Sequence, residues 1–286
     1  MHDRDKSRGV ARWRAFLFLA AWSNLVLWAL SALRVTQGSA LHVPADIDCR
    51  LQLLLCAGYV FSCAFRSVLP VYDVPRIVLV DSWLSSVVVG RSVATLGELC
   101  FAAQWALILH HLAHLSGSPF GQAASLTIVP LIVIAECFSW YAVLSTSQRG
   151  HIVENSLWGA SAALLMAGLF LIGTDRLISL YPPMLLWCVG GVAYVIFMFV
   201  FDVPMYWSRW RSDQVAGRQY LSLAQGLADV SRRWLVSYRW EDWKTEVLWM
   251  TLYFTGGVWS SISVVYACLA LTGHVTDGYP GVYWPR

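Results

Sequence analysis

The sequence contains little charge. Only 13% of its 286 residues are Asp, Glu, Lys or Arg, while 58% are hydrophobic. A soluble domain of this size needs a more charged surface, so the composition excludes an ordinary soluble protein and indicates an integral membrane protein. The chain also lacks a basic run with interleaved aromatic residues, so we expect no nucleic-acid partner. Its 16 Trp and 12 Tyr suit aromatic belts at two membrane surfaces.

Several residue patterns of known protein classes are absent. The seven cysteines form no CxxC pair, so we expect neither a zinc ribbon nor a disulfide framework. Lys6 and Lys244 are the only lysines, and neither lies in the middle of an apolar run, which excludes a retinal pigment. Membrane desaturases carry three His-rich motifs, whereas this chain has the single cluster HHLAH. A haem protein of the b561 type needs His pairs that face each other across helices, and the His residues of this chain are not placed for such pairs. Residues 246–272 lack the HxxxH that the ceramidase and progestin-receptor group carries in its last span.

What the chain does contain is long apolar runs. A helix that crosses a bilayer needs about 20 apolar residues. By this measure we predict a single all-α multi-pass membrane domain over residues 1–286, its first run kept as an anchor. Its seven transmembrane helices are expected at about 13–34, 50–69, 92–114, 124–146, 153–174, 183–202 and 246–272.

The basic residues predict an orientation for these spans. If the N-terminus is cytoplasmic, only Arg34, Arg50, Arg176 and Arg286 fall outside, and the other 16 of the 20 Lys and Arg residues fall inside. Cytoplasmic segments of membrane proteins are enriched in Lys and Arg. We therefore predict a cytoplasmic N-terminus and a C-terminus on the other side, in a membrane that the sequence does not identify.

Two segments between the spans have distinct patterns. Residues 75–90 begin with a proline and are too short to span separately, which favours an interfacial or re-entrant helix. In the loop 203–245, apolar residues recur at helical spacing among charged ones, which predicts an amphipathic helix on the cytoplasmic leaflet. A weak echo, YDVPR at 72–76 and FDVPM at 201–205, is open to interpretation as a duplication of the kind found in transporters.

Polar residues interrupt the predicted spans on their cytoplasmic halves. Arg91, Thr95 and Glu98 follow at i, i+4 and i+7 and therefore share one helix face. The next two spans and the sixth add further polar or aromatic residues at this depth, namely Glu136, Ser139, Trp140, His151, Glu154, Asn155, Trp158 and Asp202. Because ionisable residues inside a membrane are costly, we interpret them as one candidate site.

We assign roles to these residues by their chemistry. Carboxylates and imidazole serve proton transfer or an Fe, Zn or Mn site, so the candidate acid/base residues or metal ligands are Glu98, Glu136, His151 and Glu154. The candidate substrate-binding residues are Arg91, for an anionic head group, together with Asp202, Trp140 and Trp158. Structural alternatives stay open, in which Arg91 pairs only with Glu98, Arg91 and Asp202 snorkel or cap, and His151 and Glu154 form a surface pair.

A second candidate metal site lies at the other end of the third span. His110 and His114 are spaced i, i+4 and can share a metal ion. Further ligands would have to come from His42, Asp46 or Asp48 in the first outer loop. A solvated helix end rich in His is the alternative.

The sequence therefore supports three functions. The first is a membrane-embedded enzyme that acts on a lipid or other hydrophobic substrate from the inner leaflet of the bilayer. The second is a proton-coupled transporter or carrier that uses the same carboxylates. The third is a receptor-like or assembly protein in which the acidic residues pair structurally. Any of the three is compatible with a homo-oligomer.

Overall fold

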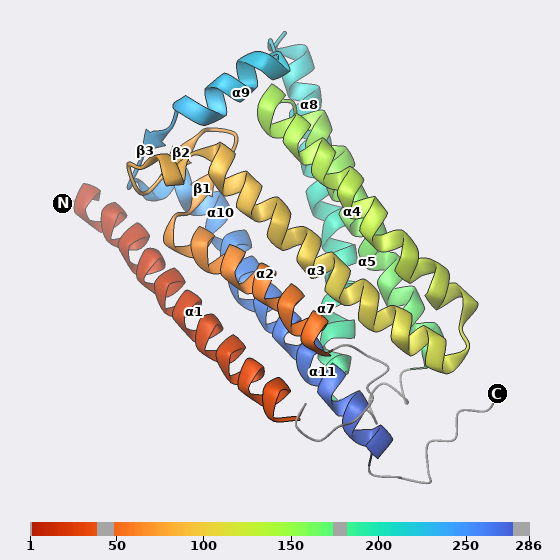
Figure 1. The fold of residues 1–286 in the computed structure, drawn as a ribbon. Coiled ribbons are helices and arrows are strands. Elements are labelled where there is room, and N and C mark those ends of the chain that lie inside the picture. The colour runs from red at the N-terminus through yellow and green to blue at the C-terminus, as the bar shows by residue number, and fades with distance from the viewer. Residues whose placement is uncertain (1, 39–48, 174–181, 277–286) are drawn as a thin grey trace.

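The chain folds as a bundle of long helices (Figure 1). The computed structural model describes residues 2–38, 49–173 and 182–276. Within them, seven helices are long and apolar enough to cross a membrane, as expected for an all-α membrane protein. The first five are α1 (His2–Gly38), α2 (Cys49–Val68), α3 (Val87–Ser116), α4 (Pro119–Ser145) and α5 (Gln148–Ile172).

The last two long helices each contain a π-helical turn. The sixth comprises α7 (Pro183–Phe197), the π turn η3 (Met198–Asp202) and α8 (Val203–Val215). The seventh comprises α10 (Trp240–Leu252), the π turn η4 (Tyr253–Gly257) and α11 (Val258–Thr276). Both helices extend beyond the predicted spans, because their polar ends continue the helical hydrogen bonding past the apolar run.

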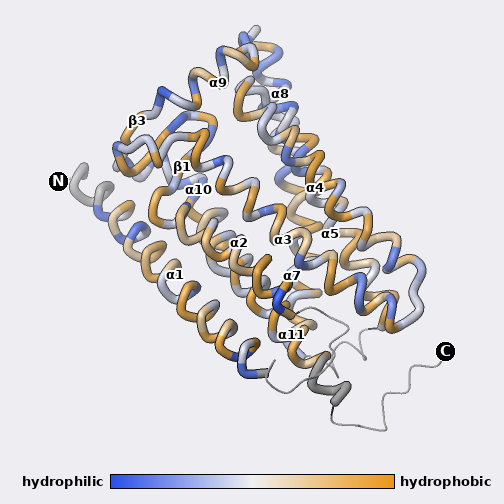
Figure 2. The backbone as a smooth tube through the Cα atoms, in the orientation of Figure 1, coloured by the Kyte–Doolittle hydropathy of each residue, from blue (hydrophilic) through white to orange (hydrophobic). Residues whose placement is uncertain are grey.

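Apolar side chains cover the outside of the bundle as well as its interior. Leu19, Leu126 and Leu186 are all more than 60% exposed although they lie within long helices. Figure 2 shows the hydrophobic colour along much of the long helices, with more of the hydrophilic colour at α8 and α9. A soluble protein rarely exposes such continuous apolar surface, so these faces are suited to contact lipid.

Tight connections force consecutive helices to pack as neighbours. The chain between α3 and α4 is only Gly117 and Ser118, and Gly117 has a φ of 66°, a left-handed conformation that glycine adopts without strain. The Ser118 hydroxyl accepts a hydrogen bond from the backbone N–H of Gly121 and so caps α4 (3.2 Å). Thr146 and Ser147 make the equally short connection between α4 and α5.

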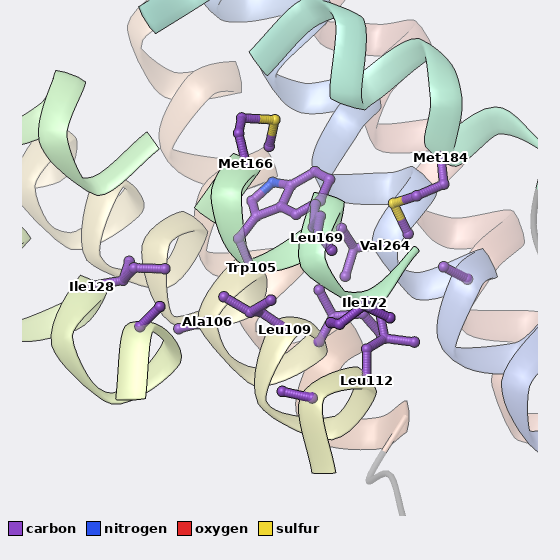
Figure 3. Packing of buried hydrophobic residues seen from close by; sticks show 14 of the residues in the cluster. Trp105, Ala106, Leu109, Leu112, Ile128, Met166, Leu169, Ile172, Met184 and Val264 are labelled. Carbon is purple, nitrogen blue, oxygen red and sulfur yellow. The ribbon is translucent and has the colours of Figure 1, made fainter. Parts of the chain in front are cut away.

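One half of the bundle has an apolar core. Trp105, Leu109 and Leu112 of α3 pack there against Met166 and Leu169 of α5 and residues of α4, α7 and α11 (Figure 3). Leu109 lies 18 residues after Arg91, which is about 27 Å along a helix axis. The apolar core is therefore well separated from the end of α3 where the charged residues lie.

A small sheet and a short helix cover the end of the bundle near the N-terminus (Figure 1). The sheet has the order β1 (Val71–Tyr72), β2 (Ile77–Val78) and β3 (Leu235–Val236), with β1 antiparallel and β3 parallel to β2. Residues 75–90, where we expected an interfacial or re-entrant helix, contain β2, the 3-10 turn η2 (Trp83–Ser85) and the start of α3. The β-branched residues Ile77 and Val78 instead pair with β1 and with β3, and β3 lies more than 150 positions away in the sequence.

The helix α9 (Leu223–Arg232) lies within the predicted amphipathic loop, between α8 and α10. Its Val230 is fully buried against Val78 and Val143, and Gly226 lies directly on the backbone of Leu144. Part of the apolar pattern of 203–245 therefore packs on the bundle. Leu223 and Leu227 remain more than half exposed.

Two long-range relationships differ from the sequence interpretation. A disulfide joins Cys49, the first residue of α2, to Cys268 of α11, although the cysteine spacing indicated no disulfide. Tyr72 ends β1 and residues 73–76 form the turn to β2, whereas residues 201–205 lie within a continuous helix. The DVP echo therefore has no structural counterpart, which removes the support that it lent to a duplicated transporter.

Candidate functional site

Three carboxylates converge on the side chain of Arg91. Its Nη2 lies 3.2 Å from Glu98 Oε2, 2.9 Å from Glu136 Oε2 and 3.4 Å from Glu154 Oε1. Arg91 and Glu98 lie on α3, Glu136 on α4 and Glu154 on α5, and all four residues are buried. Helix spacing predicted that Arg91 and Glu98 share a face, and the packing of α3, α4 and α5 brings the other two carboxylates to the same point.

Glu136 is held by a chain of hydrogen bonds. The Thr95 hydroxyl donates to Glu136 Oε2 (2.6 Å), and Trp140 Nε1 donates to Thr95 Oγ1 (3.1 Å). Trp140 is thus connected to the site through Thr95. These contacts fix the side of the Glu136 carboxylate that faces α3.

Glu98 is held by two residues that the sequence analysis did not place in the site. Tyr253 Oη donates a hydrogen bond to Glu98 Oε1 (2.9 Å), and Arg66 Nη1 lies 3.8 Å from the same oxygen. The Arg66 guanidinium also lies 5.4 Å from the centre of the Tyr253 ring, a cation–π distance. Glu98 therefore interacts with two arginines, one from α2 and one from α3.

His151 and Asp202 border the site on the side of α5 and η3. His151 Nδ1 lies 2.8 Å from Glu154 Oε2, and its ring lies 4.9 Å from the ring of Tyr206. The next residue after Glu154, Asn155, donates a hydrogen bond to Asp202 Oδ2 (2.5 Å). The His151–Glu154 pair is therefore joined directly to Arg91, and Asp202 is connected to the site through α5.

One π-helical turn contains a residue of this site, and the other contains a residue beside it. Asp202 is the last residue of η3, and Tyr253 is the first residue of η4. A π turn contains one more residue than an α-helical turn, so it changes the direction of the side chains that follow, and such turns occur frequently at functional sites. At Gly257 of η4, a Cβ would lie 2.5 Å from Tyr59 Oη, so this turn needs glycine to pack on α2.

We call Arg66, Arg91, Glu98, Glu136, Glu154, His151 and Tyr253 the Arg91 cluster. It contains three carboxylates and two guanidinium groups. An uncompensated charge buried within a membrane protein is costly. With its three carboxylates ionised and His151 neutral, the cluster would carry one net negative charge.

Three buried polar atoms in this region have no hydrogen-bond partner among the described residues. They are Glu136 Oε1, Arg91 Nε and Ser139 Oγ, and Glu136 and Ser139 are at most 3% exposed. Buried polar atoms are nearly always paired in folded proteins. Unpaired donors and acceptors at one buried point are consistent with a centre that binds a further polar group.

The metal-site expectations receive no support. Within residues 2–38, 49–173 and 182–276, no group of three or more His, Cys, Asp and Glu is arranged to hold a metal ion. Glu98, Glu136 and Glu154 have a guanidinium where a metal would have to lie. His110 Nδ1 is 3.0 Å from Ser125 Oγ, and His114 is exposed, while the further ligands proposed from His42, Asp46 and Asp48 lie outside the described residues.

One predicted residue lies elsewhere, and two others were missed. Trp158 packs against the apolar core of Figure 3. Arg66 lies within the predicted span 50–69, where a charged side chain is as costly as Arg91, and this position indicates a possible site residue. The orientation argument uses it only as a charge of the cytoplasmic loop. No sequence pattern indicates Tyr253, because its contact with Glu98 depends on how the seventh long helix packs against α3.

Comparison of the chain with protein-family models, with curated proteins and with solved structures finds no match.

Proposed function

We propose that the protein is a membrane-embedded enzyme that uses acid–base chemistry on a lipid or other hydrophobic substrate. The proposal depends on one observation, the convergence of three carboxylates and a His on Arg91 with unpaired polar atoms at the same point. A reacting group that donates a hydrogen bond would satisfy Glu136 Oε1.

The geometry suggests a role for each residue. Glu136 is the candidate acid or base that faces the substrate, because one of its oxygens is unpaired. Glu154 orients His151, which supplies or removes a proton, in the manner of a carboxylate–imidazole pair. Arg91 holds the three carboxylates in place as a positioning residue, and Tyr253 does the same for Glu98.

The charge of the cluster narrows the substrate class. We expected Arg91 to bind an anionic head group, but its charge is already compensated by three carboxylates. An anion would have to displace one of them. A substrate with a neutral or cationic polar group, and an apolar remainder, is therefore more compatible with this site.

Access to the site is proposed from the cytoplasmic leaflet. The excess of basic residues on one side supports a cytoplasmic N-terminus. The Cys49–Cys268 disulfide lies at the opposite end of the bundle, where an oxidising compartment would preserve it. The exposed Leu223 and Leu227 of α9, beside Arg232 and Arg233, suit contact with the same cytoplasmic leaflet.

Mass spectrometry of lipids tests the enzyme. The full chain in nanodiscs is incubated with a polar lipid extract of its source cells, and the lipids are compared before and after. We expect one lipid to be depleted and one to accumulate with the wild-type protein, and neither change with Glu136→Gln. Glu241→Gln is the matched control, since Glu241 pairs with Lys244 on the exposed start of α10. Turnover by Glu136→Gln at the wild-type rate would refute the assignment.

A proton-coupled carrier is the second candidate. It is favoured by the four proton-carrying groups Tyr253, Glu98, Glu154 and His151, which lie around Arg91. Arg91 itself stays protonated, so it would position these groups and would not carry the proton. The packed apolar core and the disulfide in the other half of the bundle argue against a path through it in this conformation. Proton-driven uptake by reconstituted vesicles, without any change in the lipids, would favour the carrier.

A further inference from the structure

A cavity of about 380 Å³ lies outside the Arg91 cluster, where α4, α5 and α8 meet. Phe138 and Tyr141 of α4, Arg149 at the start of α5, and Trp207 and Trp210 of α8 line it. Its wall is thus aromatic, with one charged side chain. This composition differs from that of the apolar core and needs a separate explanation.

The cavity is separate from the candidate active site. Phe138 follows Glu136 by two residues, which on a helix is a rotation of about 200° and places it on nearly the opposite face of α4. Glu136 points to α3, as its contact with Arg91 requires, so the cavity lies on the other side of α4. A ligand there would not contact the Arg91 cluster.

Two hydrogen-bond donors are available at the cavity. The Arg149 side chain is exposed, and its guanidinium lies 5.3 Å from the centre of the Trp210 ring. Trp210 Nε1 is buried and has no hydrogen-bond partner among the described residues. A buried indole N–H without an acceptor is costly, because an indole is a donor only. Arg149 can donate to an anionic acceptor in the cavity, and a small turn of the Trp210 ring toward the cavity would let its N–H reach the same acceptor.

The aromatic wall suits the apolar part of the same ligand. The rings of Trp207 and Trp210 lie 5.3 Å apart in an edge-to-face arrangement, and a second arginine, Arg211, lies 5.8 Å from the ring of Trp207. Trp, Tyr and Arg at the end of a membrane span mark the level of the lipid head groups. At Gly150, a Cβ would lie 2.6 Å from the Ala142 Cβ, so the start of α5 is pressed closely against α4 beside the cavity.

We propose that this cavity binds the phosphate of an anionic phospholipid. Arg149 and Trp210 Nε1 donate to the phosphate oxygens, and the aromatic rings contact the glycerol and the first part of the acyl chains. Basic pockets between membrane helices are a known chemistry for anionic lipid head groups, and Arg suits phosphate because its donors are planar and forked. The bound lipid joins α4, α5 and α8 on their outer side.

Native mass spectrometry of the full-length protein tests this site with phosphatidylglycerol as the probe and zwitterionic phosphatidylcholine, which has no net charge, as the comparison. We expect one phosphatidylglycerol to remain bound and Arg149→Gln to weaken its binding about ten-fold, the usual effect of losing a charge-assisted hydrogen bond. Trp210→Phe keeps the ring but removes the N–H, and it should weaken binding as well. Arg34→Gln is the control, since Arg34 is exposed near the C-terminal end of α1 and does not line the cavity.

Other outcomes would overturn the proposal. Equal retention of phosphatidylcholine would show that head-group charge does not matter. Competition by millimolar inorganic phosphate, with full loss of the bound lipid, would show a site for free phosphate instead. Unchanged binding by both Arg149→Gln and Trp210→Phe, each with a wild-type melting temperature, would exclude this cavity.

Discussion

Arg91 Nη2 and Glu136 Oε2 are 2.9 Å apart and join α3 to α4 inside the bundle. The same nitrogen is also shared by Glu98 and Glu154, so one guanidinium connects carboxylates of three helices. A single basic residue thus contacts all three buried carboxylates. The stability of this half of the bundle and the chemistry of the site therefore depend on the same contact.

Replacement of Arg91 should cost more stability than replacement of any single carboxylate. Arg91→Gln leaves three carboxylates beside one remaining guanidinium, and removal of one partner from a buried ion pair costs about 3–5 kcal/mol. We expect a clear fall in the melting temperature of the detergent-solubilised protein, measured by intrinsic fluorescence. Arg12→Gln on the exposed face of α1 is the control and should melt like the wild type. An Arg91→Gln protein with the wild-type melting temperature would contradict the paired arrangement.

Glu136→Gln should separate activity from stability. It leaves two carboxylates opposite two guanidinium groups, so the cluster becomes neutral without an added proton. We expect a loss of turnover of about 100-fold or more, as is typical for a general acid or base, with little change in melting temperature. The lipid assay and a thermal melt of the same sample measure both. A large fall in the melting temperature together with full specific activity would reverse the assignment.

The attachment of α9 should depend on pH through Asp229. Burial alone would raise the pKa of Asp229, but hydrogen bonds from Arg76 and Arg233 outweigh burial and lower the pKa below its usual value. Because the folded-state pKa is lowered, the stabilisation is fully present above the unfolded pKa of about 3.9 and is lost as the pH falls through the folded value. Arg76 is 1% exposed and also donates to the carbonyl oxygens of Asp73 and Val143.

Hydrogen exchange measures this attachment. Leu235 donates a backbone hydrogen bond to the Arg76 carbonyl (2.7 Å), so its amide reports whether β3 stays on β2. Asp229→Asn should speed exchange at Leu235 near pH 7. When deuterium labelling is carried out at strongly acidic pH, Leu235 should be protected to a similar degree in the wild type and in the variant. Equal protection of both proteins at neutral pH would show that the Arg76–Asp229 pair does not hold α9.

The Cys49–Cys268 disulfide should stabilise the bundle and report its orientation. It joins residues 219 positions apart, and a disulfide that closes so long a loop contributes about 2–5 kcal/mol. Cys49→Ser should therefore lower the melting temperature, and dithiothreitol should lower that of the wild type but not that of the variant. With the exposed Cys137 changed to Ser, a membrane-impermeant maleimide should label intact cells only after reduction, and from the outside. Labelling only after cell lysis would contradict a cytoplasmic N-terminus.

Part of the candidate site was predictable from the sequence, because the cost of charge in a membrane makes each buried ionisable residue visible. Arg91, Glu98, Glu136, His151 and Glu154 were found by this reasoning, and they do meet. Their joint role as enzyme residues stays a prediction. The predicted metal site is not supported, because the three carboxylates face Arg91. Sequence spacing does not tell whether a carboxylate faces another ligand or a guanidinium.

The sequence by itself determined the seven apolar helices, since a bilayer requires about 20 apolar residues in each span and leaves few alternatives. It also determined which residues of α3 share a face, because the helical repeat is local. Only the tertiary structure decided that Tyr253 reaches Glu98, that Cys49 meets Cys268 and that residues 77–78 pair with 235–236. Each of these contacts joins residues more than 150 positions apart, and it depends on the rotation and packing of whole helices, which no local pattern encodes.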